Sequence, residues 1–230
     1  LEKVQEGVQV IRYSLNEGEA HVQQLEIQGY SFCFDAETPF GNIARLVLGL
    51  PGYHNVENAL AALLAGQIMG VSEDKLREAL ATYRGVKRRF EIVYEGKGKV
   101  YIDDYAHHPK EIDAFMNSLR AIYPDKKLTV VFQPHLFSRT RDFAIEFAQS
   151  LSAADELVLL DIYPAREKPI EGVTAEMILG LVNGPKKRLL HKEEVVAYLA
   201  ENTDFEVLAT VGAGDIDTLV KPIKNILENN

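Results

Sequence analysis

The first part of the chain alternates apolar and polar side chains in three short stretches. These stretches cover residues 8–13, 21–27 and 29–34, and turn-forming residues separate them at 16–18 and 27–29. A period of two puts successive side chains on opposite faces of a strand, so each stretch predicts a half-buried strand. We therefore expect consecutive strands in this segment.

The pattern becomes helical after residue 55. Residues 56–69 are rich in Ala and Leu, and a second helical run covers residues 74–83. Ser72 stands just before the second run, where its hydroxyl can accept a hydrogen bond from an unpaired amide of the first turn. The segment therefore predicts two helices, the second of them capped by Ser72.

Beyond residues 86–91 apolar runs alternate with helical segments. Strands rich in Val, Ile and Leu that alternate with helices favour a mainly parallel sheet with helices on both faces, which is an α/β fold. We place the domain boundary after residue 88, giving domains 1–88 and 89–230. The predicted strands are 99–104, 128–132, 156–161 and 206–211, and the predicted helices are 109–122, 141–152, 174–181, 192–201 and 215–228.

Composition narrows the classes of protein and of partner. The 230 residues are 47% hydrophobic and 26% charged, which suits one large or two ordinary globular domains. The longest apolar runs fall far short of the roughly 20 residues that cross a bilayer, and no signal-peptide pattern opens the chain. The net charge of −9 argues against a nucleic-acid partner, although not against a nucleotide. These features predict a cytoplasmic protein without membrane or nucleic-acid partners.

Two clusters of polar residues lie before or at the predicted boundary. His54, Asn55 and Asn58 stand at a helix start, and the two asparagines share a face from which their amides could meet a flat ring. The alternative is that Asn55 only caps the helix. Arg88 and Arg89 follow Lys87 and could hold a phosphate or ribose, unless they form a solvated basic hinge.

Two further clusters lie where predicted strands end. The first contains Asp103, Asp104, Tyr105, His107 and His108, followed by Pro109 at the favoured first position of a helix; the second contains His135, Ser138, Arg139 and Arg141. Ligands of α/β sheets bind at the carboxyl ends of strands, and guanidinium groups suit a carboxylate or phosphate. We expect Asp104, Tyr105, His107, His135 and Arg139 to converge in one crevice at the ends of adjacent strands.

Other residue types carry weaker signals. Adjacent histidines tend to point apart and no Cys or His cluster completes a ligand set, so we predict no metal site. Cys33 lies in an alternating stretch and is interpreted as a small strand residue. The pair Gly212 and Gly214 permits close backbone approach but lacks the third glycine of a dinucleotide fingerprint.

Six motifs, taken in order over residues 50–216, resemble the Mur ligases. They are Gly-Tyr-His-Asn-x-x-Asn, Arg-Arg-Phe-Glu, Asp-Asp-Tyr-Ala-His-His-Pro, Phe-Gln-Pro-His-x-x-Ser-Arg-Thr, Asp-Ile-Tyr and Gly-Ala-Gly-Asp. The resemblance implies the end of a central ATPase domain followed by a Rossmann-like C-terminal domain. The third and fourth motifs resemble the branch that adds L-alanine to UDP-N-acetylmuramate, and the murein-peptide recycling ligase is the alternative.

The resemblance also implies roles for single residues. His54, Asn55 and Asn58 would bind the nucleotide, with the asparagines on the adenine; Arg89 would contact the phosphates and Asp104 the ribose. Tyr105, His107, His135 and Arg139 would face the alanine and an acyl-phosphate. At Leu136 many family members carry arginine, so a contact from that position is lost or supplied elsewhere.

The implied reaction uses ATP and Mg²⁺ to activate the muramoyl carboxylate, which the alanine amine then attacks. The chain contains no Gly-x-x-x-x-Gly-Lys-Ser/Thr phosphate loop, so we expect residues 1–88 to be the end of a longer domain, the metal ligands to lie outside this chain, and the chain alone to be inactive. A non-catalytic module that binds a nucleotide in the same crevice is the competing interpretation, because a fold does not fix a function.

Overall fold

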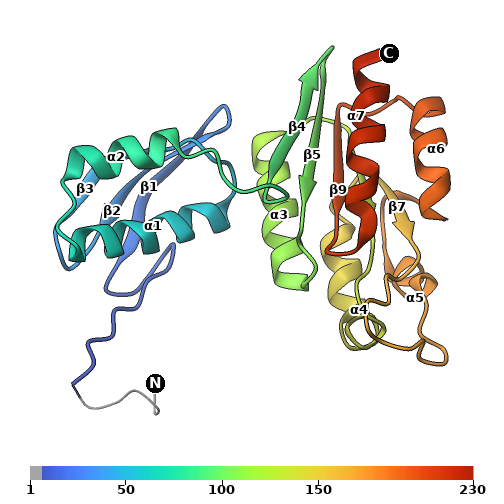
Figure 1. The fold of residues 1–230 in the computed structure, drawn as a ribbon, viewed down its shortest axis with the longest axis horizontal. Coiled ribbons are helices and arrows are strands. Elements are labelled where there is room, and N and C mark those ends of the chain that lie inside the picture. The colour runs from blue at the N-terminus through green and yellow to red at the C-terminus, as the bar shows by residue number, and fades with distance from the viewer. Residues whose placement is uncertain (1–6, 230) are drawn as a thin grey trace. The chain divides into compact units, whose positions relative to one another are not determined.

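The computed structural model describes residues 7–229, and its contacts divide the chain into two compact units (Figure 1). The first unit ends at Arg84 and the second begins at Gly85. The start of the predicted first domain, residues 1–6, lies outside the described part. None of the helices within residues 7–229 has the length and apolar content that a bilayer crossing requires.

The first unit contains an antiparallel sheet and two helices. Strands β1 (His21–Gln28), β2 (Ser31–Glu37) and β3 (Ile43–Leu48) pair in the order β1-β2-β3. Alternate side chains of β2, Phe32 and Phe34, are buried as the period of two requires. The strand predicted over residues 8–13 is wrong: only Tyr13 forms an isolated bridge, and Val8 and Val10 are exposed, so this stretch has no apolar face to bury.

Helices α1 (Tyr53–Ile68) and α2 (Glu73–Thr82) complete the first unit. Ser72 occupies the N-cap position of α2, as predicted, but its side chain makes no capping hydrogen bond. Its backbone carbonyl instead accepts the N–H of Leu76 at 3.1 Å. The prediction that the Ser72 hydroxyl caps α2 is therefore wrong, and Ser72 contributes only through its backbone carbonyl.

The second unit is built on a six-stranded sheet in the order β4-β5-β9-β6-β7-β8. β4 is antiparallel to β5, and every other pair is parallel, which confirms the α/β fold with a mainly parallel sheet. The strands are β4 (Glu91–Gly96), β5 (Lys99–Asp104), β6 (Leu128–Phe132), β7 (Glu156–Leu160), β8 (Lys186–Leu190) and β9 (Val207–Val211).

Two of these strands were not predicted, and both are edge strands. β8 opens with Lys186, Lys187 and Arg188, and β4 has no fully buried side chain. An edge strand needs to bury less apolar surface than a central one, so its sequence carries a weaker hydrophobic signal. The four predicted strands are the ones that the sheet encloses.

Helices cover both faces of this sheet (Figure 1). α3 (Pro109–Ile122), α4 (Phe137–Leu151) and α5 (Ala175–Leu181) form one layer, and α6 (Val195–Glu201) and α7 (Val220–Asn229) form the other. Within β6, Val131 joins the core beneath α6 and α7, while Phe132 packs against Phe147 of α4 with ring centroids 5.6 Å apart. The segments predicted as helices 192–201 and 215–228 open with short 3₁₀ turns, and α4 begins four residues earlier than expected.

Candidate functional site

The loops that leave the carboxyl ends of β5, β9, β6 and β7 are joined to one another by backbone hydrogen bonds. The Gly212 N–H donates to the Asp104 carbonyl at 3.0 Å, and the Tyr163 N–H donates to the Pro134 carbonyl at 2.8 Å. The expectation that the two main loops follow adjacent strands is wrong, because β9 lies between β5 and β6. The loop after β9 therefore lies between the loops that follow β5 and β6.

Four rings form a continuous row along this edge. The centroids of Tyr105 and His107 lie 5.4 Å apart, those of His107 and His135 lie 6.0 Å apart, and those of His135 and Tyr163 lie 5.8 Å apart. Arg139 places a guanidinium nitrogen 3.3 Å from Nδ1 of His135. The structure thus brings together Tyr105 and His107 from the loop after β5, His135 from the loop after β6, and Arg139 from the first turn of α4.

The hydrogen-bond partners define the proton positions on both histidines. Arginine can only donate, so Nδ1 of His135 accepts from Arg139 and its proton lies on Nε2. Burial, and after it the positive charge of Arg139, lower the pKa of His135, which favours the neutral form of this ring. His107 has the opposite arrangement: its Nδ1 donates to the Tyr105 carbonyl at 3.0 Å, which leaves Nε2 as the acceptor of the neutral ring.

Asp104 is buried at the end of β5, with 2% of its surface exposed. Its two carboxylate oxygens accept the N–H groups of Phe90 and Ala106, each at 2.7 Å. Burial raises the pKa of Asp104 to about 6, although the two backbone hydrogen bonds oppose this shift. In this structure Asp104 organises the backbone on either side of it, and contact with a ribose stays a prediction that would use the remaining lone pairs.

Asp103 and Arg88 have structural roles that the sequence did not indicate. Asp103 is fully buried, where it accepts hydrogen bonds from Arg88 Nε at 3.0 Å and from the Thr210 hydroxyl at 2.6 Å. A second guanidinium nitrogen of Arg88 donates to the Gly212 carbonyl at 2.6 Å. Burial raises the pKa of Asp103, and the Thr210 and Arg88 contacts oppose that effect.

Arg89 differs from its neighbour in exposure. Its side chain is 43% exposed, and its nearest charged partner is Glu111 at 4.0 Å. The guanidinium lies 5.6 Å from the ring centroid of Tyr105. A half-exposed guanidinium beside an aromatic ring fits an anionic group such as a phosphate.

The nucleotide candidates of the first unit lie at the start of α1. Gly52, with φ of 113°, is the N-cap of this helix, so the interpretation of Asn55 as its cap is wrong. Asn55 is buried inside the first turn and donates its amide to the Pro51 carbonyl at 2.6 Å. Asn58 is exposed and His54 is half-buried. Their contact with a nucleotide stays a prediction.

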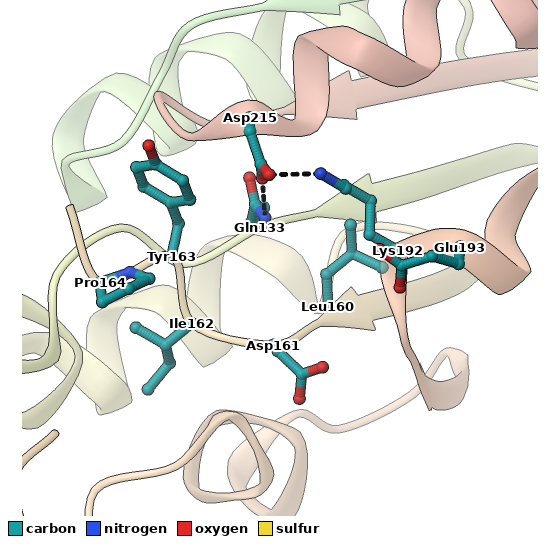
Figure 2. Close-up of a pocket in the computed structure, with 9 residues that line it drawn as sticks. All are labelled: Gln133, Leu160, Asp161, Ile162, Tyr163, Pro164, Lys192, Glu193 and Asp215. Atoms are coloured by element: carbon teal, nitrogen blue, oxygen red, sulfur yellow. Dashed lines mark hydrogen bonds and ion pairs between the residues drawn. The ribbon is translucent and has the colours of Figure 1, made fainter.

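A polar pocket of about 220 Å³ opens beside the ring row, at the ends of β6, β7 and β9 (Figure 2). Figure 2 shows Gln133 and Lys192 directed at the carboxylate of Asp215; the Gln133 amide donates to it at 2.8 Å, and Lys192 forms an ion pair with it. The lining residues are Gln133, Leu160, Asp161, Ile162, Tyr163, Pro164, Lys192, Glu193 and Asp215. Tyr163 belongs both to this pocket and to the ring row.

Sequence reasoning gave no role to several residues of this edge. Gln133, Tyr163 and Asp215 lie inside the fourth, fifth and sixth of the motifs that resemble the Mur ligases. Their place in these motifs was a signal, but it did not indicate a role for the single residues. Lys192 follows the unpredicted strand β8, and nothing in the sequence around it pointed to the site.

The two glycines after β9 are explained by packing between loops. A Cβ on Gly212, whose φ is 145°, would lie 2.7 Å from the Gln133 carbonyl oxygen. A Cβ on Gly214 would lie 2.8 Å from Cβ of Tyr163. Glycine is therefore required at both positions for the loop to approach its neighbours.

The described residues supply groups for a phosphate but not for a magnesium ion. Within residues 7–229 no group of three or more His, Cys, Asp or Glu side chains is arranged to hold a metal. Asp103 and Asp104 are both buried and hydrogen-bonded to protein groups. The described residues therefore offer no set of ligands that would hold Mg²⁺.

A mainly parallel sheet whose carboxyl edge gathers imidazole, phenol and guanidinium groups defines an α/β domain, and ligands of this class of domain bind at that edge. Two domain families match the chain: the Mur ligase middle domain over residues 2–66, and the Mur ligase glutamate ligase domain over residues 88–217. The second match covers more than half of the chain. This chain belongs to the Mur ligase family, which confirms the resemblance of its motifs.

Individual relatives narrow the comparison. The chain is 46% identical over 212 residues to a UDP-N-acetylmuramate–L-alanine ligase of Cytophaga hutchinsonii, covering 92% of this chain and 45% of the relative. It is 46% identical over 225 residues to the ligase of that name in Phocaeicola vulgatus, covering 97% of this chain and 49% of the relative.

A solved structure agrees with these relatives. The crystal structure of the UDP-N-acetylmuramate–alanine ligase from Thermotoga maritima superposes with a TM-score of 0.80 at 26% identity, covering 95% of this chain and 48% of that one. The chain spans about half the length of the proteins that it matches.

Proposed function

We propose that this chain is part of a ligase that uses ATP to join L-alanine to UDP-N-acetylmuramate in peptidoglycan synthesis. The names of its relatives support the substrates, and the contact between Arg139 and His135 beside His107 and Tyr105 is the single observation that carries the proposal. The reaction first activates the muramoyl carboxylate as an acyl-phosphate. The alanine amine then attacks the acyl carbon, and the bond to the phosphate oxygen breaks.

The side chains of the ring row suit the second step. The planar fork of Arg139 would hold the alanine carboxylate through paired hydrogen bonds. The amine must lose a proton as its bond to carbon forms, and His107 is the base because its Nε2 is the acceptor of the neutral ring. His135 carries its proton on Nε2 and therefore acts as a donor. Arg89 would neutralise phosphate charge as the phosphate leaves.

Replacing Arg139 tests this proposal in the longer protein that contains the chain. Arg139→Ala should lower kcat/KM for alanine at least about tenfold, or about 1.4 kcal/mol, because the carboxylate loses its partner. Arg141→Ala is the matched control, since Arg141 lies on the same helix but is 54% exposed and bonds to Asp142 at 2.7 Å. If the two variants had the same kcat/KM for alanine, Arg139 would not be a residue of the site.

The 230-residue chain alone should not ligate alanine. Its sequence has no Gly-x-x-x-x-Gly-Lys-Ser/Thr loop, whose amides and lysine neutralise the transferred phosphoryl group, and Arg89 cannot replace that set of donors. Phosphate release from ATP, measured with UDP-N-acetylmuramate and alanine present, checks this expectation. Release by this chain at the rate of the longer protein would contradict it. Binding of nucleotide without ligation by the longer protein would favour a non-catalytic module.

A further inference from the structure

The three residues before β4 have an unusual backbone. Arg88 and Phe90 adopt the left-handed conformation, with φ of 61° and 50°. Side chains other than glycine rarely adopt this conformation, which costs on the order of 1 kcal/mol per residue. Interactions from the end of β5 maintain it: the Tyr105 N–H donates to the Arg88 carbonyl at 2.7 Å, and the Phe90 N–H donates to Asp104 at 2.7 Å.

The side chain of Arg88 uses the resulting geometry to join three segments. Its guanidinium donates to Asp103 at the end of β5 and to the carbonyl of Gly212 in the loop after β9. The same group lies 5.0 Å from the ring centroid of Tyr105. Arg88 thus contacts both the backbone and the ring of Tyr105. A planar fork is needed for this arrangement, because one ammonium group cannot reach the carboxylate and the carbonyl from the same position.

Arg88 and Arg89 are adjacent in sequence but differ in surroundings. The Arg88 side chain is 19% exposed and pairs with the fully buried Asp103. The Arg89 side chain is 43% exposed, and its ion pair with Glu111 is long. Two nitrogens of Arg88 make the hydrogen bonds to Asp103 and Gly212, and the third pairs with Asp217 at 3.7 Å. The guanidinium of Arg89 is therefore the more accessible of the two to a ligand.

We propose that Arg88 is a positioning residue of the ligase site, which fixes the Tyr105 ring and the loop after β9 while Arg89 meets the ligand. This inference rests on the proposed function, because it assigns the two residues to one reaction. The physical basis is that Arg88 contacts Tyr105 twice, through its carbonyl and through its guanidinium. If Arg88 moves, the first ring of the row loses both the backbone and the ring contact that hold it. The Gly212 carbonyl would lose its hydrogen bond at the same time.

The positioning role can be measured on the 230-residue chain without an activity assay. Arg88→Ala could fail to fold, because Asp103 would be left buried without a partner, so the variant of choice is Arg88→Met with Asp103→Asn. Asparagine at 103 keeps an acceptor for the Thr210 hydroxyl. The matched control is Lys126→Met with Glu206→Gln, which removes an exposed ion pair at the opposite edge of the same sheet.

Two NMR signals should respond in the test variant and remain unchanged in the control. The Tyr105 amide should exchange with solvent at least about tenfold faster, because its acceptor carbonyl is no longer held in place. The ring resonances of Tyr105, assigned with Tyr105→Phe, should also shift. The amide of Phe115, in the core of α3, reports on general loosening and should keep its protection. Unchanged exchange and ring resonances at Tyr105 would overturn the proposal.

Steady-state kinetics of the longer protein complete the test. Arg88→Met with Asp103→Asn should lower kcat about tenfold with little change in KM for ATP, whereas Arg89→Met should raise that KM, because only Arg89 would contact the nucleotide. Arg88→Lys should not restore kcat. A variant at Arg88 that raises KM for ATP as Arg89→Met does would overturn the assignment. If the unaltered protein ligates no alanine, the proposed function fails, and the Tyr105 signals still decide whether Arg88 positions that ring.

Discussion

At the amino edge of the six-stranded sheet, charged side chains form exposed ion pairs. Lys126 and Glu206 approach to 2.6 Å with side chains 48% and 43% exposed, and Lys127 pairs with Asp204 beside them. At the carboxyl edge of the same sheet, Asp103 is fully buried against Arg88, and Asp104 is buried against backbone amides. The pairs of Lys126 and Lys127 are open to water, whereas the pair of Arg88 and Asp103 is largely shielded from it.

The difference in solvent access separates ion pairs that water screens from a buried pair that holds the surrounding backbone. An exposed ion pair gains little, because water and salt screen it. A buried carboxylate depends on its partners, because the low-dielectric interior offers no substitute for them. We therefore expect the buried carboxylates beside the ring row to be sensitive to substitution, and the exposed pairs of Lys126 and Lys127 to tolerate it. Four experiments test this contrast.

Removing the buried carboxylate should have the largest effect. Asp103→Ala leaves Arg88 and the Thr210 hydroxyl without their acceptor, so we expect the second unit to lose about 4 kcal/mol of unfolding free energy. Urea unfolding followed by circular dichroism measures the loss. The amino-edge variant Glu206→Ala is the comparison. If Asp103→Ala cost no more than Glu206→Ala, the contrast between the edges would be wrong.

The titration of Asp104 should be the next largest effect. Its folded pKa of about 6 lies above the ordinary value of 3.8, so the folded protein binds this proton more tightly than the unfolded chain does. The stabilisation is therefore fully present below about pH 4 and is lost as the pH rises through about 6, a change on the order of 3 kcal/mol.

Carboxyl ¹³C NMR of the chain measures this pKa directly, and Asp104→Asn identifies the signal. Asp204 at the amino edge serves as the reference, because its hydrogen bond to Lys127 lowers its pKa below the ordinary value. A midpoint for Asp104 at or below that of Asp204 would contradict the expected effect of burial.

A methyl group in the loop after β9 should have an intermediate effect. Gly214→Ala would press its Cβ against Oε1 of Gln133 and against Tyr163, so overpacking should cost about 2 kcal/mol and disturb the stacking of Tyr163 on His135. Gly180→Ala is the control, since no atom lies within 4 Å of the added Cβ in α5, and helix propensity should stabilise it by about 0.5–1 kcal/mol. The urea midpoints of unfolding compare the two variants. If both variants shifted the midpoint in the same direction, the loop after β9 would not be tightly packed.

The smallest effect is expected at the amino edge. Lys127→Met removes the ion pair with Asp204, whose side chain is 94% exposed, and should leave the urea midpoint unchanged within error. The hydrogen bond to Asp204 raises the pKa of Lys127, and added salt should weaken that shift. A clear drop in the midpoint would show that this edge, too, carries stabilising pairs.

Much of the fold could be predicted because its signals are local. The enclosed strands β5, β6, β7 and β9 are short apolar runs, and the period of each helix repeats within its own sequence. The edge strands β4 and β8 were missed because an edge strand requires little burial. The segment 8–13 has the alternation of a strand but forms only the isolated bridge of Tyr13, so pairing and not pattern decided its structure.

Local patterns of the sequence are enough to predict which chemical groups follow the strand ends. Tyr105, His107, His135 and Arg139 can each be picked out from their motifs. Only the tertiary structure decided how these groups meet. The insertion of β9 between β5 and β6 places Gly212 against Asp104, and Arg88 pairs with the buried Asp103. Burial and hydrogen bonding depend on contacts between residues far apart in the chain, and a local pattern contains no record of them.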